Sequence, residues 1–403
     1  MSTASALRLN RRVDAMQPSA TLAMKARAGA MRRAGHPVIA LSAGEPDFNT
    51  PAPIREAGIA AIQNGFTNYT ENAGMPALRE AIAAKLAADN GLSYSADQIL
   101  CSNGAKQSVA LGIHVLCDAG DEVLIPAPYW VSYPEMARFA GATPVTLPTS
   151  VHDGYRLTPE ALDAAITDKT RLLVMCSPSN PTGAVYTPDE LAALAAVVRA
   201  YDGLYVLSDE IYEHVLYDAE HRSFAALPGM QERTVTVNGF SKAYAMTGWR
   251  LGYLAAPAPI RDAAAKVQGQ FTSAPSSISQ KAGIAALEMG PGPVQEMVAA
   301  FRQRRDYVLE RLRALPGVTC PEPQGAFYLF PHIADVLGAR TPDGTRIESS
   351  EDLCFYLLEH CHVALVPGEA FGAPEGMRLS YASSMEDLET ALDRITEGLN
   401  ALR

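Results

Sequence analysis

The sequence predicts an α/β fold with a mostly parallel sheet that helices cover on both faces. Between about Cys101 and Ala255, short β-rich runs alternate with longer amphipathic stretches. Near-continuous apolar runs are typical of strands buried on both faces, and helical stretches such as residues 188–201 then serve as crossovers. In such a sheet, ligands bind at the carboxyl ends of the strands. The predicted strands begin with EVLIP at Glu122, RLLVMC at Arg171, LYVLSDE at Leu204, TVTVN at Thr234 and RLGYL at Arg250.

After Pro259 the pattern changes and predicts a second, α+β part of the chain. The N-terminal segment, with a helix over residues 19–33, lacks a core of its own, so we expect it to pack on this C-terminal part. The expected organisation is residues 1–50 packing on a small domain, 51–290 as the large domain, and 291–403 as the small domain. The predicted C-terminal elements are a long helix-like segment after Pro259, helices over 294–315 and 385–402, and strands around 327–330, 363–366 and 377–381.

Composition and charge narrow the class of protein. The 403 residues are 48% hydrophobic and 19% charged, which is typical of a globular chain long enough for more than one domain. Basic side chains number 33 and acidic ones 44, so the net charge of −11 repels nucleic acid phosphates. The longest apolar stretches, such as residues 191–198, are too short to cross a bilayer. We therefore expect a soluble protein that binds neither nucleic acids nor membranes.

The cysteines and the first residues bear on the cellular compartment. The spacing of the six cysteines matches no zinc or CxxC pattern, so we predict small buried side chains and no metal. So few cysteines in so long a chain do not make a disulfide framework, which predicts a cytoplasmic location. Residues 1–12 lack the apolar centre of a secretory signal. They faintly resemble an organelle transit peptide, but we expect an unstructured N-terminus.

The segment that most strongly indicates chemistry is NGFSKAYAMTGWRLGY, residues 238–253. A predicted strand ends there just before Ser241 and Lys242, and Arg250 follows eight residues after the lysine. A lysine at a strand end suits imine chemistry, because nearby positive charge and partial desolvation favour the neutral amine. Ser241 and Arg250 are suited to hold a phosphate. Taken alone, the segment is equally typical of a solvated surface loop.

Two other strand ends are expected beside this one. Asn180 lies in the turn SPSNPTG, a pattern that by itself often has only a structural role. Asp209 ends an apolar run, where an unpaired carboxylate is costly, so we expect a partner such as a pyridinium nitrogen, or a helix N-cap role. Tyr212 lies one helical turn further and faces the same pocket if a helix begins there, although a single tyrosine is more often a core residue.

A fourth strand end and an aromatic pair complete the candidate site. At SNGAKQ, which contains Gly104, Ala105 and Lys106, a strand gives way to a helix whose first amides are suited to bind a phosphate. Such turns are common, so the signal is weak on its own. Tyr129 and Trp130 supply an aromatic surface for a flat ring, or are simply two core side chains.

Together these motifs resemble those of class I pyridoxal-phosphate aminotransferases of fold type I, with the closest likeness to the bacterial-type aspartate aminotransferase branch. The likeness runs from about Arg11 to the C-terminal helix. It implies a large domain with a mostly parallel seven-stranded sheet between helices, a smaller α+β domain from both chain ends, and pyridoxal 5'-phosphate as cofactor. The motifs are PSAT at Pro18, AGEPDF at Ala43, NYTENAGMPALREAIA at Asn68, SNGAKQ, PAPYWVSYPEM at Pro126, NPTG, SDEIY, FSKAYAMTGWRLGY, GAFYLF at Gly325, VPGEAFG at Val366 and MRLSYA at Met377.

The resemblance implies a role for each matching position. Lys242 would form the imine with the cofactor and carry the proton between the substrate and cofactor carbons. Asp209 would keep the ring nitrogen protonated, and Tyr212 would hydrogen-bond the ring hydroxyl. Trp130 would stack on the ring, with Tyr129 as the alternative if the alignment shifts by one. The other implied contacts are Asn180 to the ring hydroxyl; Ser241, Arg250, Gly104, Ala105, Lys106 and the partner subunit's Tyr69 in a homodimer to the phosphate; and Arg378, Gly44, Lys106, Trp130 and Asn180 to the substrate.

The resemblance also bears on the substrate. In one aspartate-specific branch, a partner-subunit arginine binds the distal carboxylate, but the position that matches it here is Gln268. In the branch that this chain resembles, the lysine of the Gly-Ala-Lys turn meets that carboxylate, which makes Lys106 the candidate. Members of this branch that act on prephenate often have a basic residue before PSA, where Gln17 stands. Gly239 occupies the position of a phosphate-binding hydroxyl found in some members of the family.

The activity implied is ping-pong transfer of an amino group, most closely between aspartate and 2-oxoglutarate. A lysine discriminates less rigidly than a bidentate arginine, so an aromatic, alanine, prephenate or broad-range aminotransferase stays open. A β-lyase on the same fold is a more distant alternative. A ligand-sensing regulator with an aminotransferase-like domain would need a DNA-binding segment, for which we expect no room. The expected partners are small-molecule amino and 2-oxo acids.

Overall fold

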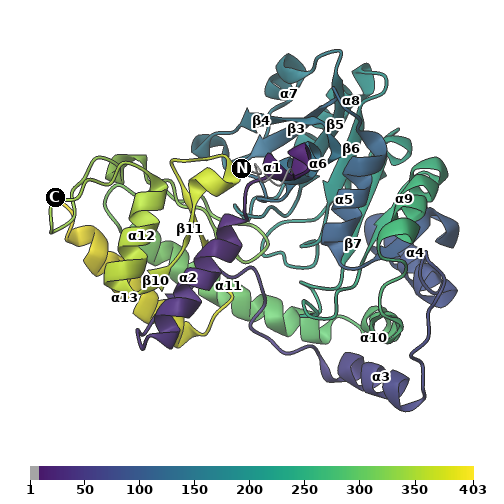
Figure 1. Ribbon diagram of the computed structural model, residues 1–403, viewed down its shortest axis with the longest axis horizontal. Helices are drawn as coiled ribbons and strands as arrows, with labels where there is room; N and C mark the ends of the chain where they lie inside the picture. Colours follow the sequence, from purple (N-terminus) through teal and green to yellow (C-terminus); the bar gives the residue numbers. More distant parts are fainter. Residues whose placement is uncertain (1–8) are drawn as a thin grey trace, which may run out of the picture.

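A seven-stranded sheet forms the centre of the larger part of the computed structural model, which describes residues 9–403 (Figure 1). The strands follow the order β2-β8-β7-β6-β5-β3-β4. Neighbours from β7 to β4 are parallel, and β8 runs antiparallel to both of its neighbours. The predicted mostly parallel, seven-stranded sheet is confirmed. Its strands are β2 (Ile99–Ser102), β3 (Glu122–Ala127), β4 (Thr143–Pro148), β5 (Thr170–Cys176), β6 (Tyr205–Asp209), β7 (Thr234–Gly239) and β8 (Gly252–Ala255).

Side chains of the central strands alternate between two layers of helices. In β5, Leu172 and Val174 pack in the cluster that contains α5, whereas Leu173 and Met175 pack in the cluster that contains α8. Successive side chains of a strand point to opposite faces, so a strand covered on both faces has to be apolar throughout. The helices on the first face are α5 (Ala105–Leu116), α6 (Tyr133–Ala140) and α9 (Ala258–Phe271), and those on the second are α7 (Pro159–Ala165) and α8 (Pro188–Ala200).

The starts of the predicted helices are set by capping residues. Helix α8 begins at Pro188 because Thr187 and Glu190 form a capping box, in which each side chain accepts a hydrogen bond from the other's backbone amide at 3.2 and 2.8 Å. Helix α2 (Ala20–Arg33) begins after Ser19, whose hydroxyl accepts from the amide of Leu22.

The two ends of the chain share a second core. Met24 of α2 lies in one apolar cluster with Phe301 and Leu392 of the C-terminal helices. Strand β1 (Ile39–Ala40) also pairs in parallel with β10 (Val363–Ala364). In Figure 1 helix α2 accordingly lies among the C-terminal helices. The boundaries at residues 50/51 and 290/291 stay predictions. The C-terminal elements are α11 (Gly292–Arg313), α12 (Ser350–Cys361), α13 (Met385–Asn400), β9 (Tyr328–Leu329), β11 (Val366–Pro367) and β12 (Met377–Ser380).

Two elements that the sequence predicted as continuous are each divided in the structure. The long helix-like segment after Pro259 is two helices, α9 and α10 (Ser277–Glu288). Ser273 has a φ of +57° and Pro275 lacks an amide proton, so the segment between them cannot continue the helix. The predicted strand over 363–366 is split into β10 and β11, which belong to different sheets. The remaining helices are α1 (Arg11–Asp14), α3 (Ala52–Gln63) and α4 (Pro76–Asn90).

The helices and the cysteines bear on the predicted compartment. Within residues 9–403, the structure contains no helix long and apolar enough to span a membrane. All six cysteines are free thiols; four are buried, and Cys176 and Cys361 are partly exposed. The expectation about the N-terminus concerns residues 1–12, of which residues 1–8 lie outside the described residues.

Candidate active site

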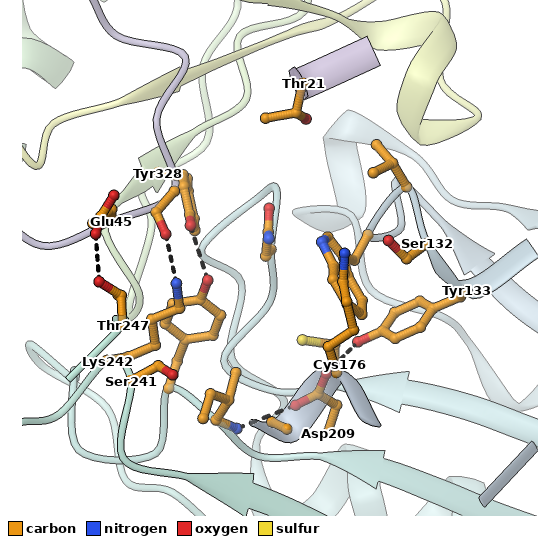
Figure 2. Close-up of a pocket in the computed structure, with 18 of the residues that line it drawn as sticks. Thr21, Glu45, Ser132, Tyr133, Cys176, Asp209, Ser241, Lys242, Thr247 and Tyr328 are labelled. Carbon is orange, nitrogen blue, oxygen red and sulfur yellow. Dashed lines mark hydrogen bonds between the residues drawn. The ribbon is translucent and has the colours of Figure 1, made fainter. Parts of the chain in front are cut away.

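A pocket of about 340 Å³ lies at the carboxyl ends of the parallel strands (Figure 2). Cavities of this size accommodate a small organic ligand. Its walls come from the turns after several neighbouring strands and from both chain ends, in agreement with the location expected for a ligand in this type of sheet. The predicted site residues that line it are Gly44, Ala105, Lys106, Trp130, Asn180, Asp209, Tyr212, Ser241, Lys242, Arg250 and Arg378.

Gly104 does not line the pocket, but it shapes the part that is suited to a phosphate. It precedes α5 with a φ of +85°, and a Cβ there would lie 2.6 Å from Nη2 of Arg250. Glycine thus allows the guanidinium to lie against the chain at the start of the helix, where Arg250 donates to the carbonyl of Asn103 at 3.3 Å. The amide end of α5, Arg250 and Ser241 together form a cradle for a phosphate.

Tyr69 is the other predicted residue outside the pocket of its own chain. Its side chain is fully exposed, at 101% of the reference value. The phenol follows α3 and makes no hydrogen bond within residues 9–403. Any contact of Tyr69 with a cofactor site must therefore involve a second copy of the chain.

Lys242 lies in the turn that follows β7, and its amine donates a hydrogen bond to the carbonyl of Gly44 (Figure 2). Burial lowers the pKa of the amine to about 8, and the positive charges of Arg378 and Arg250 act in the same direction against the carboxylate of Glu45. At pH 7, about one tenth of the amine is then neutral and free to attack an aldehyde, far more than for a lysine of ordinary pKa.

This lowered pKa predicts a pH profile for cofactor attachment. Because only the neutral amine reacts, the rate at which cofactor-free protein takes up pyridoxal phosphate should rise with pH through a midpoint at about 8. The measurement is stopped-flow absorbance after mixing the cofactor-free protein with pyridoxal phosphate between pH 6 and pH 10. A rate that still rises steeply above pH 9.5 would show that the amine keeps an ordinary lysine pKa.

Asp209 ends β6 and is buried beneath the pocket. Its carboxylate accepts a hydrogen bond from the hydroxyl of Tyr133 at 2.7 Å (Figure 2). Burial raises the pKa of Asp209 to about 6, although the bond from Tyr133 opposes this rise. No Lys, Arg or His of the described chain forms an ion pair with this carboxylate, so it is available to a cationic ring nitrogen from a ligand.

Tyr212 reaches the pocket from a turn and not from a helix, which corrects the geometry considered from the sequence. The amide of Glu210 donates to the carbonyl of Val237 in β7 at 2.8 Å, and residues 211–214 then form a turn in which the amide of Glu213 donates to the carbonyl of Glu210 at 2.9 Å. No helix follows, and Asp209 is not an N-cap. The hydroxyl of Tyr212 lies 2.8 Å from that of Tyr328.

Arg378 is the most deeply buried cation of the pocket, with 2% of its surface exposed. Its guanidinium donates to the side-chain oxygen of Asn180 at 3.0 Å and to the carbonyl of Ser42 at 2.7 Å. The rings of Tyr328 and Phe371 lie 4.7 and 5.1 Å from it. These neutral contacts orient the side chain without cancelling its charge, so it is ready for a carboxylate.

Lys106 and Trp130 occupy one wall together. The ammonium of Lys106 lies 4.9 Å from the centre of the Trp130 ring. Burial lowers the pKa of Lys106, and the nearby Arg250 adds to this effect. Tyr129, the alternative to Trp130, lies outside the lining of this pocket and would contact a Cβ placed at Gly372. The structure therefore brings Trp130, and not Tyr129, to the site.

Several lining residues were not singled out from the sequence. Tyr133 and Tyr328 are the most informative, because their hydroxyls bond Asp209 and Tyr212. Both lie inside motifs that carried the resemblance, but neither motif shows which way a phenol points. The further lining residues without a predicted role are Ser19, Thr21, Leu22, Glu45, Val131, Ser132, Cys176, Ile211 and Thr247.

Gln268 does not take part in the pocket. Its side chain is fully buried, and its amide donates to the carbonyls of Asn72 and Cys101 at 2.8 and 2.9 Å. The structure thus agrees that this residue does not bind the distal carboxylate of a substrate.

A buried charged cluster holds the turn that carries Tyr212. Ligand atoms of Glu210, Glu213 and His221 lie within 4.8 Å of one another, which is a possible arrangement for a metal. The ammonium of Lys85, however, bonds Glu213 directly. Burial raises the pKa of Glu213, but Lys85 and the neighbouring histidines bring it down to about 2. We therefore regard the cluster as a structural ion-pair network.

The arrangement as a whole defines a class of enzyme. A buried lysine of lowered pKa near a buried carboxylate, beside a phosphate cradle, is what chemistry on pyridoxal phosphate requires. Within this class the chain belongs to the family "Aminotransferase class I and II", whose profile matches residues 36–395. Members of this family use pyridoxal phosphate to transfer amino groups between amino acids and 2-oxo acids. The resemblance noted in the sequence is confirmed.

Individual relatives are similar over almost the whole chain. The aspartate aminotransferase of Pinus pinaster is 54% identical over 98% of this chain and 81% of its own length. The bifunctional aspartate aminotransferase and glutamate/aspartate-prephenate aminotransferase of Petunia hybrida is also 54% identical, over 98% and 83% of the two chains. The crystal structure of the aspartate aminotransferase from Rhizobium meliloti superposes with a TM-score of 0.96 at 44% identity, covering 99% and 100%. The predicted fold type I architecture is thereby confirmed.

Proposed function

We propose that this protein transfers the amino group between aspartate and 2-oxoglutarate, with Lys242, Asp209 and Tyr212 as catalytic residues. The proposal rests chiefly on the charges of the pocket. Arg378, Lys106 and Arg250 all line it, and none of the three forms an ion pair with a carboxylate of the described chain. Arg378 is buried, and an unpaired buried cation is costly unless a ligand supplies the anion. Lys106 and Arg250 line the same pocket with exposed side chains, so their charges are free to attract the anions of a ligand.

The number of cations matches the anions of a dicarboxylate substrate on pyridoxal phosphate. Arg250, with the amide end of α5, would bind the phosphate. Arg378 would bind the α-carboxylate in bidentate fashion. Lys106 is then left for the distal carboxylate, which aspartate and 2-oxoglutarate both have. A substrate with an apolar side chain would leave this third cation without a partner.

The residues of the chain support the reaction in distinct ways. When bound, the cofactor takes up the amino group and withdraws electrons from the carbon that loses a proton. The amine of Lys242, with its pKa of about 8, carries that proton at neutral pH. Asp209 would supply the negative charge that keeps a ring nitrogen protonated, and Tyr212 would hydrogen-bond the ring hydroxyl. Trp130 lines the pocket and would cover one face of the ring, which excludes water.

The test of this proposal is the variant Lys106→Gln. A charge-assisted hydrogen bond contributes about 1.5–3 kcal/mol, so kcat/KM for aspartate should fall by about 10- to 100-fold. For alanine, which has no distal carboxylate, kcat/KM should change by less than about threefold. Both values are measured by steady-state kinetics with 2-oxoglutarate as acceptor.

Lys169→Gln, a change of an exposed lysine outside the pocket, serves as the control and should leave both values unchanged. Equal losses for aspartate and alanine in Lys106→Gln would contradict the role of this residue. The absorbance of the bound cofactor is followed in parallel with L-aspartate, L-phenylalanine, L-alanine and L-cystathionine. Release of pyruvate from cystathionine would instead indicate a β-lyase.

Prephenate is a second candidate acceptor, because the Petunia hybrida relative carries it in its name at 54% identity. The residue before the PSAT motif is Gln17, which has no positive charge for an additional carboxylate. We therefore place prephenate behind 2-oxoglutarate. Comparing kcat/KM for the two acceptors with aspartate as donor decides between them.

The same proposal includes a homodimer with sites shared between subunits. Besides Tyr69, the residues Ile59 and Ile62 of α3 and Phe271 of α9 expose more than half of their side chains, and we propose that a second subunit contacts them. A fully active monomer in light scattering would contradict this proposal. The free thiols support a cytoplasmic location, which belongs to the proposal as well.

A further inference from the structure

Two fully buried glutamines hold the loop of residues 70–75, which follows Tyr69. Gln280 of α10 has no exposed surface. Its side-chain oxygen accepts a hydrogen bond from the amide of Met75 at 2.7 Å. Its nitrogen donates to the hydroxyl of Thr70 at 2.9 Å and to the carbonyl of Pro275 at 2.8 Å. One amide group thus holds both ends of the loop.

The middle of the loop is held by Gln268 of α9, which is also fully buried. Its nitrogen links the carbonyl of Asn72 in the loop to that of Cys101 in β2. Asn72 returns a bond to the backbone of α9, from its amide to the carbonyl of Ala265 at 2.8 Å. The loop is therefore tied to the sheet and to two helices.

A buried arginine completes the support. Arg79 of α4 donates to the carbonyl of Gly74 at 3.1 Å and to the carboxylate of Glu71 at 2.9 Å. Gly74 has a φ of +97°, and a Cβ there would lie 2.7 Å from the Cys101 side chain. The loop passes so close to β2 that only glycine fits.

So many buried polar contacts specify one conformation of a surface loop. The side-chain oxygens of Gln268 and Asn72 have no hydrogen-bond partner among the described residues, but the nitrogens of both amides and both polar atoms of the Gln280 amide are bonded. A network of this kind rigidifies the backbone that it bonds. The residue in front of this loop is Tyr69, a fully exposed phenol without a contact to its own pocket. A rigid support for a side chain that contacts nothing in its own subunit suggests a target outside that subunit.

We propose that Gln268 and Gln280 are positioning residues for the cofactor site of the partner subunit. By ordering residues 70–75, they hold Tyr69 where it meets the phosphate in the neighbouring subunit, so each subunit completes the site of the other. This inference rests on the homodimer of the proposed function. It gives Gln268 a role that differs from substrate recognition.

The first measurement is cofactor affinity in the variant Gln280→Met, which keeps the side-chain volume and removes the amide. The dissociation constant of pyridoxal phosphate, from absorbance titration, should rise by about 5- to 20-fold, which corresponds to about 1–2 kcal/mol. Gln268→Met, which removes different bonds, should act in the same direction. Gln231→Met removes a bond from a partly exposed glutamine to the carbonyl of Ser93 and should have no effect. Unchanged affinity in both buried-glutamine variants would overturn the inference.

Mixed dimers test whether the effect crosses the interface. In the first mixed dimer, one subunit carries Lys242→Ala and the other carries Gln280→Met. The only site that keeps Lys242 is in the Gln280→Met subunit, and the loop that reaches it comes from the other subunit, in which Gln280 is unchanged. The cofactor affinity of this site should be that of the unaltered protein. In the second, both changes are on one subunit, and the lysine site of the other subunit receives the altered loop. Its affinity should be weakened as in the Gln280→Met homodimer. A purely local effect on stability predicts the reverse pattern and would overturn the inference.

The same two mixed dimers with Tyr69→Phe in place of Gln280→Met separate this inference from the proposed dimer. If Tyr69→Phe shows the crossed pattern and the glutamine variants do not, the inference about Gln268 and Gln280 alone is wrong. If Tyr69→Phe also fails to show it, the shared site of the proposed function is wrong, and the inference falls with it.

Discussion

Replacing Lys242 by alanine is expected to abolish amino transfer while the chain still folds. Burial lowers the pKa of this amine to about 8, and the amine contacts the carbonyl of Gly44 directly. Loss of its proton transfer alone should lower the rate by about 10²- to 10⁴-fold. Loss of the covalent attachment of the cofactor adds to this. The measurement is steady-state turnover of aspartate and 2-oxoglutarate at pH 8, with circular dichroism as the check of folding.

Two further variants show which property of Lys242 matters. Lys242→Arg keeps a positive charge, but a guanidinium stays protonated at all accessible pH values, so it should be as inactive as the alanine variant. Lys169→Ala removes an exposed lysine outside the pocket and should retain full activity. Substantial turnover by Lys242→Ala would overturn the central assignment of the active site.

Replacing Asp209 by asparagine is expected to lower turnover and cofactor affinity and, at pH 7.5, to raise the stability of the cofactor-free protein. Removing one partner of a buried ion pair costs about 3–5 kcal/mol, so turnover should fall by about two to four orders of magnitude. Cofactor affinity should fall too, because asparagine cannot pair with a protonated ring nitrogen. Steady-state kinetics and absorbance titration measure the two effects.

The stability of the cofactor-free protein should change in the other direction. The folded carboxyl has a pKa of about 6, against the ordinary 3.8, because it is buried. The unfolded chain therefore releases this proton at lower pH, and the folded state loses stability as the pH rises from about 4 to 6. Above pH 6 the cost is about 3 kcal/mol. Asp209→Asn removes the buried charge and with it this cost, so the variant should be more stable than the unaltered protein at pH 7.5 but not at pH 4.

Urea denaturation of the cofactor-free protein at both pH values measures this difference. Tyr133→Phe is the matched control, because it removes the hydrogen bond to Asp209 and keeps the charge. It should lower cofactor affinity much less than Asp209→Asn does. A loss of stability at pH 7.5 in Asp209→Asn would mean that the carboxylate already has a cationic partner, besides its hydrogen bonds, in the cofactor-free protein.

Much of the site could be predicted from the sequence because it lies on local motifs. Lys242, Asp209 and Asn180 each follow an apolar strand, and parallel strands bring their carboxyl ends to one edge of the sheet. The order of the motifs along the chain was therefore enough to group these side chains. Arg378 was identified only by resemblance, since its short strand belongs to another sheet.

What could not be predicted depends on contacts between distant segments. Tyr133 bonds Asp209 across 76 residues, and Tyr328 lies beside Tyr212 across 116 residues. The spacing of Asp209 and Tyr212 suggested a helix, but the amide of Glu210 bonds β7 and the chain then makes only a short turn. Neighbours in the sequence cannot show which of Tyr129 and Trp130 faces a pocket.

By itself, the sequence determined the class of fold, the family and the set of reactive groups. These follow from the period of apolar residues and from short motifs, because both are local properties of the chain. The tertiary structure alone decided the environment of each group. It buries Asp209 and Lys242 and shifts their pKa values in opposite directions relative to their ordinary values. It also places Gln268 in the support of a loop and not in the pocket. Desolvation and hydrogen bonding depend on what packs around a side chain, and the surrounding residues come from distant parts of the chain.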